Sequence, residues 1–194
     1  MGMAYAIDCE GHLDLSPCYK GMGCDMMLAS EISHEYFFAE LQDLVAWDGL
    51  PIRGMGTEAK WRHLVCGHGK DGLPMNPMTD LELERVRRLP VLKGVVRGEF
   101  PVDLYMQCNR KGIVDKVELV IDGPEVDYLV SLGFFETHYI VRSAYPAGAR
   151  YAKRVRERGT YCGSIGRCEM EKPRISGSEA GQVLSYKQRA HPRL

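Results

Sequence analysis

After Pro101 the apolar residues change from helical spacing to alternation with polar residues, and this change constrains the fold most. The segments with a two-residue period are 102–109, 116–122, 127–135 and 137–145. Turn-forming residues at 110–112 and 123–124 separate the first three segments. Side chains along a strand point alternately to opposite faces of a sheet. The pattern therefore predicts a small antiparallel sheet of about four strands.

Two helical patterns precede this region. Apolar residues recur at helical spacing in residues 26–47, and again from Thr79 to Leu92. Pro90 is expected to kink or divide the second helix. A basic stretch at 149–158 predicts one or two further helical turns. The fold class is therefore α+β, with N-terminal helices packed on one face of the sheet.

The domain organisation follows from the same patterns. We expect residues 1–158 to form a single α+β domain. Residues 159–194 are rich in Gly, Ser, Pro and charge, and we expect a loop-rich basic C-terminal tail there. The length of 194 residues fits one domain.

Composition and cysteine usage favour a cytoplasmic protein. No run approaches the ~18 uncharged apolar residues that a membrane span needs. The N-terminus lacks the basic and apolar regions of a secretory signal. The seven cysteines are an odd number, which argues against a fully paired disulfide framework. We therefore expect reduced thiols, a cytoplasmic location and no membrane partner.

Charge is distributed unevenly along the chain. Residues 1–60 contain 3 basic and 10 acidic residues, whereas residues 134–194 contain 12 basic and 5 acidic ones. The C-terminal third could therefore face a polyanion, whereas the N-terminal third could not. A dipolar, nearly neutral globule is the open alternative.

Two histidines, His63 and His68, lie five residues apart in the segment HLVCGH. A turn at Gly67 would bring both rings to one cleft. Histidine can give and take a proton near neutral pH, so the pair is a candidate acid and base. The alternative is one surface histidine and one loop histidine without a shared role.

The segment 137–145 carries polar side chains among β-forming residues. Constant alternation places His138 and Arg142 on one face, and Ser143 with Tyr145 on the other. Arg142 and Ser143 meet at one ligand only if the strand has a bulge or ends there. An arginine at such a place can form bidentate bonds with a phosphate. The alternative is a solvated outer face.

Metal and cofactor motifs are weak. Cys66, His68, Cys162 and Cys168 could supply four zinc ligands, but the spacings Cys-x-His and Cys-x5-Cys lie outside the usual close ones. Independent thiols are favoured, and no cofactor is expected. The chain also has no glycine-rich phosphate loop, no GxSxG elbow and no HExxH motif.

Three segments together carry a resemblance to a known group. They are RHLVCGH, ERVRRLPVLKGVV and IVRSAYP, within residues 60–146. They resemble a helical His-x4-His segment, the following helix and the terminal strand of the barnase–EndoU–colicin E5/D–RelE superfamily. Members of that superfamily are small metal-independent ribonucleases, and the likeness is to the versions carried by phages and polymorphic toxins. Two departures are Arg142, where the pattern has an apolar residue, and Ser143, where it usually has threonine.

The resemblance implies cleavage of RNA by attack of the ribose 2′-hydroxyl. That reaction needs a base, an acid and cations for the phosphate. The implied catalytic residues are His63, His68, Arg142, Ser143 and Tyr145. The implied substrate-binding residues are Arg85, Arg88, His138 and Arg150.

The implied partners are RNA, either tRNA or mRNA, and an inhibitor or immunity protein. Two other function classes stay open. One is a phage-type binding or inhibitor module that uses the same fold without catalysis. The other is a small zinc-stabilised structural domain.

Overall fold

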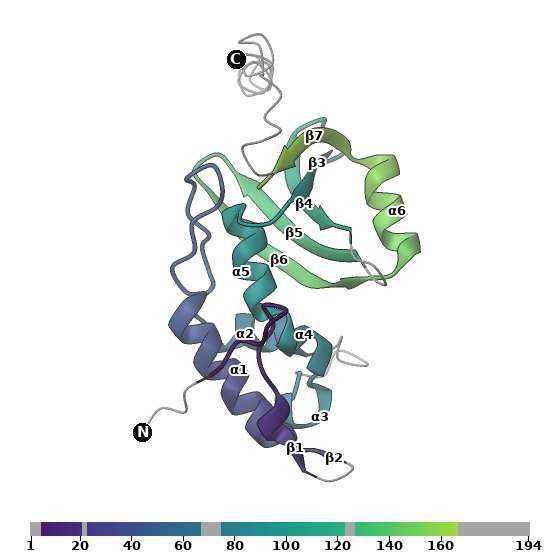
Figure 1. Ribbon diagram of the computed structural model, residues 1–194. Coiled ribbons are helices and arrows are strands. Elements are labelled where there is room, and N and C mark those ends of the chain that lie inside the picture. Colours follow the sequence, from purple (N-terminus) through teal and green to yellow (C-terminus); the bar gives the residue numbers. More distant parts are fainter. Residues whose placement is uncertain (1–4, 21–22, 67–74, 123–126, 167–194) are drawn as a thin grey trace.

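The computed structural model describes residues 5–20, 23–66, 75–122 and 127–166. Its central feature is a five-stranded antiparallel sheet with the strand order β6–β5–β4–β3–β7 (Figure 1). The strands are β3 (Val102–Cys108), β4 (Val114–Ile121), β5 (Asp127–Phe135), β6 (His138–Ala147) and β7 (Thr160–Ile165). The α+β class is confirmed, with five strands in the sheet where about four were expected.

The additional strand, β7, comes from residues expected to begin the loop-rich tail. It pairs with β3, where Gly163 faces Leu104. Gly163 has a positive φ of 112°, and the register shifts between Leu104 and Tyr105. These irregularities explain why the segment shows no regular alternation in the sequence. Residues 167–194 of the expected tail lie outside the described residues.

The helices precede and follow the main strands. They are α1 (Met26–Glu40), α2 (Glu58–Val65), α3 (Pro77–Asp80), α4 (Leu83–Arg87), α5 (Leu89–Arg97) and α6 (Ala149–Arg158). A 3-10 helix, η1 (Ser16–Cys18), leads into a small hairpin of β1 (Tyr19–Lys20) and β2 (Gly23–Cys24). The first helix ends at Glu40, earlier than the expected 26–47.

Local signals explain where several helices begin and end. The Asp25 side chain accepts a hydrogen bond from the backbone N–H of Leu28 and caps α1. The expected division at Pro90 is present, because α5 begins with this proline in its first turn, where its missing N–H costs nothing. Gly98, with φ of 71°, ends α5.

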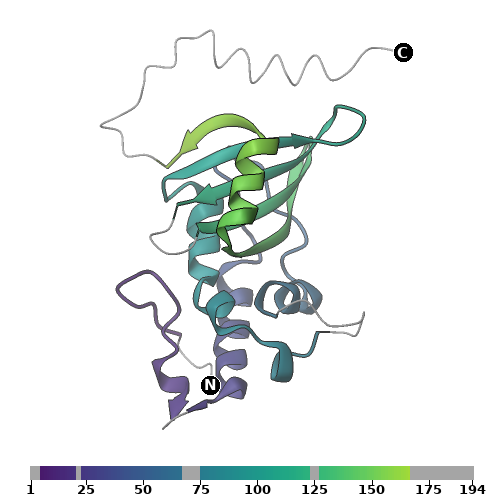
Figure 2. The same ribbon diagram turned by 90° about the vertical axis from the view of Figure 1, so that its right-hand side faces the viewer.

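Helices lie on both faces of the sheet. Helix α5 lies against one face, and α6 lies across the other (Figures 1 and 2). The larger core cluster joins buried residues of α1, α2 and α5 to the face that carries Leu119, Val130 and Leu132. A smaller cluster forms beneath α6, around Leu129 and Val155. Within the described ranges, no helix is long and apolar enough to cross a membrane.

Strand β6 forms one outer edge of the sheet, and the chain between α1 and α2 covers it. The Tyr139 N–H donates to the Pro51 oxygen at 3.0 Å, and the Arg53 N–H donates to the Tyr139 oxygen at 2.8 Å. An uncovered edge strand would present unpaired backbone groups to other chains. This connection therefore satisfies the edge at Tyr139 from within the molecule.

Candidate functional site

Strand β6 contains a β-bulge at Arg142. Val141 pairs with Leu132 of β5, and Ser143 pairs with the adjacent β5 residue, Ser131, so Arg142 is the extra residue. An extra residue interrupts the alternation of side chains. Arg142 and Ser143 therefore lie on the same face, the one that α6 covers in part, called the α6 face below. The expectation of constant alternation is wrong for this reason.

The Arg142 side chain lies across the neighbouring strands on the α6 face. Its Nη2 donates to the backbone oxygen of Asp115 at 3.2 Å and lies 4.0 Å from Asp115 Oδ2. The side chain passes over Gly133, where an added Cβ would lie 2.9 Å from Arg142 Nε. Glycine at position 133 therefore makes room for the guanidinium, which is directed toward β4.

A fully buried carboxylate, Glu118, lies on the same face, opposite Ser131 of β5. Burial raises the pKa of Glu118, and the Lys116 ammonium, which forms an ion pair with it, opposes that shift. Glu118 stands within a β-forming run, so its sequence context gave no reason to select it. The α6 face thus contains an acid with an increased tendency to hold its proton.

His63 reaches β6, but it contacts the backbone there. Its Nε2 lies 2.6 Å from the carbonyl oxygen of Arg142. One turn earlier in α2, Lys60 Nζ donates to the Val141 oxygen at 2.7 Å. These side chains dock α2 onto two consecutive carbonyls at the bulge. The geometry therefore gives His63 a structural task.

Of the other two expected histidines, His138 is described, and it contacts its own β-hairpin. The His138 ring stacks on Phe135, with centroids 4.8 Å apart and an interplanar angle of 4°. Its Nδ1 lies 3.1 Å from the Thr137 hydroxyl. His138 therefore belongs to the end of the β5–β6 hairpin. His68 lies outside the described residues.

Three of the expected residues meet in a hollow between α4 and the end of β6. The hollow has a volume of about 640 Å³ and is called the arginine pocket below. The expected residues that line it are Arg85, Arg88 and Tyr145. The remaining lining residues are Glu10, His12, Glu82, Glu84, Arg87 and Pro146. The pocket therefore combines cationic donors with a histidine, carboxylates and a phenol.

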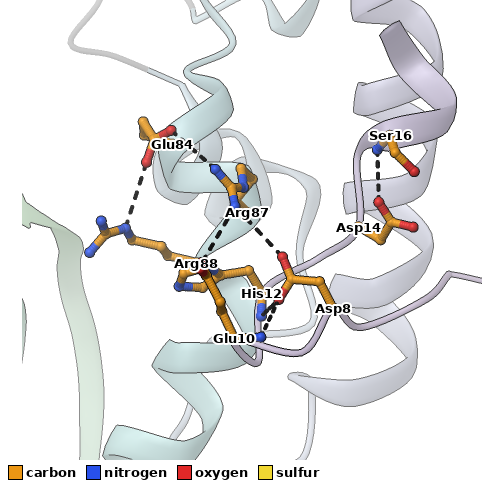
Figure 3. Close-up of polar contacts among 8 residues, drawn as sticks. All are labelled: Asp8, Glu10, His12, Asp14, Ser16, Glu84, Arg87 and Arg88. Carbon is orange, nitrogen blue, oxygen red and sulfur yellow. Dashed lines mark hydrogen bonds and ion pairs between the residues drawn. The ribbon is translucent and has the colours of Figure 1, made fainter.

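His12 enters the pocket from a tight loop (Figure 3). The Asp8 carboxylate accepts the backbone N–H groups of Glu10 and His12, each at 2.9 Å. The His12 N–H is the main reason that the pKa of Asp8 lies below its usual value. The Leu13 N–H donates to the Arg87 oxygen at 2.8 Å and ties the loop to α4. His12 Nδ1 lies 3.4 Å from Glu10 Oε2, so a carboxylate is near enough to orient the ring.

Carboxylates hold the three arginines in position. Arg85 Nε lies 2.5 Å from a carboxylate oxygen of Glu82. Glu84 lies between the other two, 3.7 Å from Arg87 Nη1 and 3.8 Å from Arg88 Nε (Figure 3). A guanidinium has five N–H donors, so the single carboxylate neighbour of Arg85 and of Arg88 leaves donors available to a ligand, whereas Arg87 is also near Asp8 and Glu10.

Tyr145 closes the pocket from β6. The guanidinium carbon of Arg85 lies 5.6 Å from the centroid of its ring. Burial raises the pKa of the Tyr145 hydroxyl, and the neighbouring Tyr151 adds to the shift. The phenol therefore holds its proton more firmly than an ordinary tyrosine; it can donate a hydrogen bond, and it can release the proton to a strongly basic oxygen such as an alkoxide.

The remaining expected residues lie apart from this pocket. Arg142 and Ser143 lie on the α6 face, but neither of them lines the arginine pocket. Arg150 is exposed in the first turn of α6. Sequence reasoning missed His12 and Arg87, because no local motif connects the N-terminal loop to α4.

Of the four residues weighed as zinc ligands, Cys66 and Cys162 are described, and His68 and Cys168 lie outside the described residues. In the described part of the chain, the group of His and acidic side chains close enough to share an ion is Asp8, Glu10 and His12. Arg87 Nη2 lies 3.6 Å from Asp8 Oδ2 and 3.9 Å from Glu10 Oε2, so a guanidinium already neutralises these carboxylates. Cys66 is buried at the end of α2, and burial raises the pKa of its thiol to about 11, which disfavours the thiolate that zinc binds.

The arginine pocket is thus the place where residues for anion binding and proton transfer come together. No protein-family model, curated protein or solved structure matches the chain.

Proposed function

We propose that this protein is a metal-independent ribonuclease that cleaves RNA, a tRNA or mRNA, in the arginine pocket. The observation that carries the proposal is the convergence of three arginines, His12 and Tyr145 around one hollow. These residue types match the two needs of the reaction, binding of a phosphate and transfer of protons. The resemblance to the barnase–EndoU–colicin E5/D–RelE superfamily supports the same reaction class.

The proposed reaction transfers one proton at each end of the scissile bond. His12 removes the proton of the ribose 2′-hydroxyl, and the 2′-oxygen forms a bond with phosphorus. The bond between phosphorus and the 5′-oxygen breaks, and that oxygen takes the proton of the Tyr145 hydroxyl. The products are a 2′,3′-cyclic phosphate and a free 5′-hydroxyl. Protonated His12 then returns a proton to the phenolate, which restores the site.

Arg87 and Arg88 are the proposed phosphate-binding groups. Negative charge increases on the phosphate oxygens as the 2′-oxygen attacks, and fixed cationic donors stabilise that charge. Glu84 holds both guanidinium groups, and Arg87 also lies near Asp8 and Glu10, so Arg88 has more N–H donors free for a phosphate than Arg87 has. Pre-positioned donors of this kind need little rearrangement when the substrate binds.

His63 has no catalytic role in this proposal. Its Nε2 is engaged by the Arg142 carbonyl, so that nitrogen is not free to exchange a proton with substrate. Arg142 and Ser143 are likewise left out, because they do not line the pocket.

The test is cleavage of a fluorescently labelled RNA oligonucleotide in the presence of EDTA. We expect wild type to cut the RNA and His12→Ala to reduce the rate by about 10²–10⁴, the usual effect of losing a positioned acid or base. Arg88→Gln is expected to reduce it by about 10²–10³ through loss of charge stabilisation. The matched control is Arg62→Gln, since Arg62 is an exposed arginine of α2 outside the pocket. Melting temperatures measured alongside separate loss of chemistry from loss of folding.

Three outcomes decide the proposal. Absence of cleavage by wild type in EDTA, across tRNA and mRNA substrates, overturns it and leaves a binding or inhibitor module as the better assignment. Full activity of His12→Ala overturns the assigned base. An equal loss in Arg62→Gln and Arg88→Gln shows that general charge, and not the pocket, governs the rate.

A further inference from the structure

Four side chains from three elements form a continuous ladder that leaves the arginine pocket. Arg85 of α4 lies over the Tyr145 ring of β6, at 5.6 Å from its centroid. The Tyr145 ring meets the Tyr151 ring of α6 edge to face, with centroids 5.8 Å apart. Arg154, one turn further along α6, lies 5.5 Å from the centroid of the Tyr151 ring. The ladder therefore runs from Arg85, whose side chain is nearly buried, to Arg154, which is exposed.

The outer end of this Arg–Tyr–Tyr–Arg ladder lies on a strongly basic helix. Arg156 is already committed, because it forms ion pairs with Asp122 and Asp127. Arg150 and Arg154 are exposed and have no ion-pair partner among the described residues. Arg154 at the outer end of the ladder and Arg150 on the same helix therefore carry unneutralised positive charge. A polyanion would be attracted to this side of the molecule.

We propose that the ladder is a binding track for single-stranded RNA, which leads the strand over α6 into the arginine pocket. This inference rests on the proposed function, because it names the substrate class of the same site. Unpaired bases can stack on aromatic rings and on guanidinium planes, whereas the bases of a duplex are stacked inside it. Interleaved aromatic and cationic side chains are therefore suited to a single strand.

The alternative explanation of the ladder is structural. Tyr145 and Tyr151 pack against the small core beneath α6, and Arg154 could simply cover Tyr151. The exposed position of Arg154 argues against a purely structural role, because an exposed arginine adds little to stability. The two explanations differ in what removal of the ring or the outer cation does to RNA affinity.

The test measures binding of a fluorescein-labelled single-stranded RNA of about 12 nucleotides, a length within the range of single-strand sites. Fluorescence anisotropy is recorded for wild type, Arg154→Gln and Tyr151→Leu, in EDTA and with a 2′-O-methyl backbone that cannot be cleaved. The matched control is Arg158→Gln, which removes one positive charge from an exposed arginine of α6 that lies outside the ladder and, like Arg154, has no ion-pair partner among the described residues. Tyr151→Leu keeps an apolar side chain against the core, and the melting temperature verifies folding. Duplex RNA and single-stranded DNA of the same sequence complete the set of probes.

We expect each ladder variant to weaken binding of the single strand about 10-fold, and Arg158→Gln to weaken it less than about 3-fold. Equal losses in Arg158→Gln and Arg154→Gln would overturn the track in favour of general charge attraction. Binding of duplex RNA as tight as that of the single strand would also overturn it, as would absence of single-strand binding by wild type. Tight binding of single-stranded DNA supports the track, because stacking of bases does not require a 2′-hydroxyl. In that case, discrimination between RNA and DNA is assigned to the arginine pocket.

Failure of this inference is distinguishable from failure of the proposed function. If RNA is cleaved and the ladder variants bind and cleave like wild type, the track is wrong and the pocket assignment stands. If the ladder variants lose single-strand binding but wild type cleaves no RNA, the track stands and the ribonuclease assignment fails.

Discussion

Replacement of His63 by alanine separates a structural role from a catalytic one. His63 Nε2 is 2.6 Å from the Arg142 oxygen, and this contact helps to dock α2 on the bulge. A neutral hydrogen bond of this kind contributes about 0.5–1.5 kcal/mol. The His63 side chain is half-buried, so water can reach the freed carbonyl and limit the cost. We expect His63→Ala to lower the free energy of unfolding by about 1 kcal/mol.

The neighbouring lysine should matter more. Lys60 is a charged donor to the Val141 oxygen at 2.7 Å, and burial lowers the pKa of its ammonium. Hydrogen bonds to charged groups contribute about 1.5–3 kcal/mol, so Lys60→Met, which keeps the apolar stem, should cost about that much. Arg62→Ala is the control on the same helix, because Arg62 is exposed and has only a 4.0 Å pair with Glu58. It should change stability by less than about 0.5 kcal/mol.

Urea denaturation followed by circular dichroism measures these differences. For a chain of this size, about 1 kcal/mol corresponds to a decrease in Tm of about 2–4 °C. RNA cleavage per folded molecule should be unchanged in His63→Ala. A loss of about 10² or more in cleavage with an unchanged Tm would refute the structural assignment of His63 and restore it as a candidate acid or base.

Three further predictions follow from other parts of the structure. Burial raises the pKa of Glu118 above its ordinary 4.5, so the contribution of Glu118 to stability declines as pH rises from about that value. Glu118→Gln should remove this dependence. In urea denaturation near pH 4.5 and pH 7.5, the free energy of unfolding of the variant, relative to that of wild type, should therefore be higher at pH 7.5. Tyr139→Phe removes the 2.9 Å hydrogen bond to the Asp48 carboxylate and should lower the free energy of unfolding by about 1.5–3 kcal/mol in the same assay. No change would show that water replaces the bond fully. Gly133→Ala places a methyl group 2.9 Å from Arg142 Nε, and the Arg142 side chain can rotate away because it is 47% exposed. The free energy of unfolding should therefore change by less than about 1 kcal/mol, and the cleavage rate should not change. A decrease in cleavage rate of about 10² would assign Arg142 to the active site.

The sequence predicted the elements well where local chemistry determines them. The four alternating segments became strands, and Pro90 divided the second helical pattern, because strand periodicity and the missing proline N–H act over a few residues. Strand β7 was missed, because its pairing with β3 is long-range and Gly163 interrupts its pattern.

The candidate site was only partly predictable. Arg85, Arg88 and Tyr145 were selected through the resemblance, and they do line one pocket. The bulge at Arg142 could not be read from the chain, since it depends on the partner strand. His12 could not be selected either, because a hydrogen bond from the following residue to α4 places its loop in the pocket, and neither segment carries a motif for that contact.

The closure of the β6 edge has a consequence for folding cooperativity. The backbone of Tyr139 is bonded to Pro51 and Arg53, which belong to the connection between the first two helices. The Tyr139 backbone therefore loses both partners if this connection unfolds first, and the connection loses them if the sheet unfolds first. The calorimetric and van't Hoff enthalpies of unfolding of this protein should consequently agree, as they do for a single all-or-none transition. A fragment that contains the strands without residues 51–53 would expose the backbone of Tyr139 and be prone to self-association.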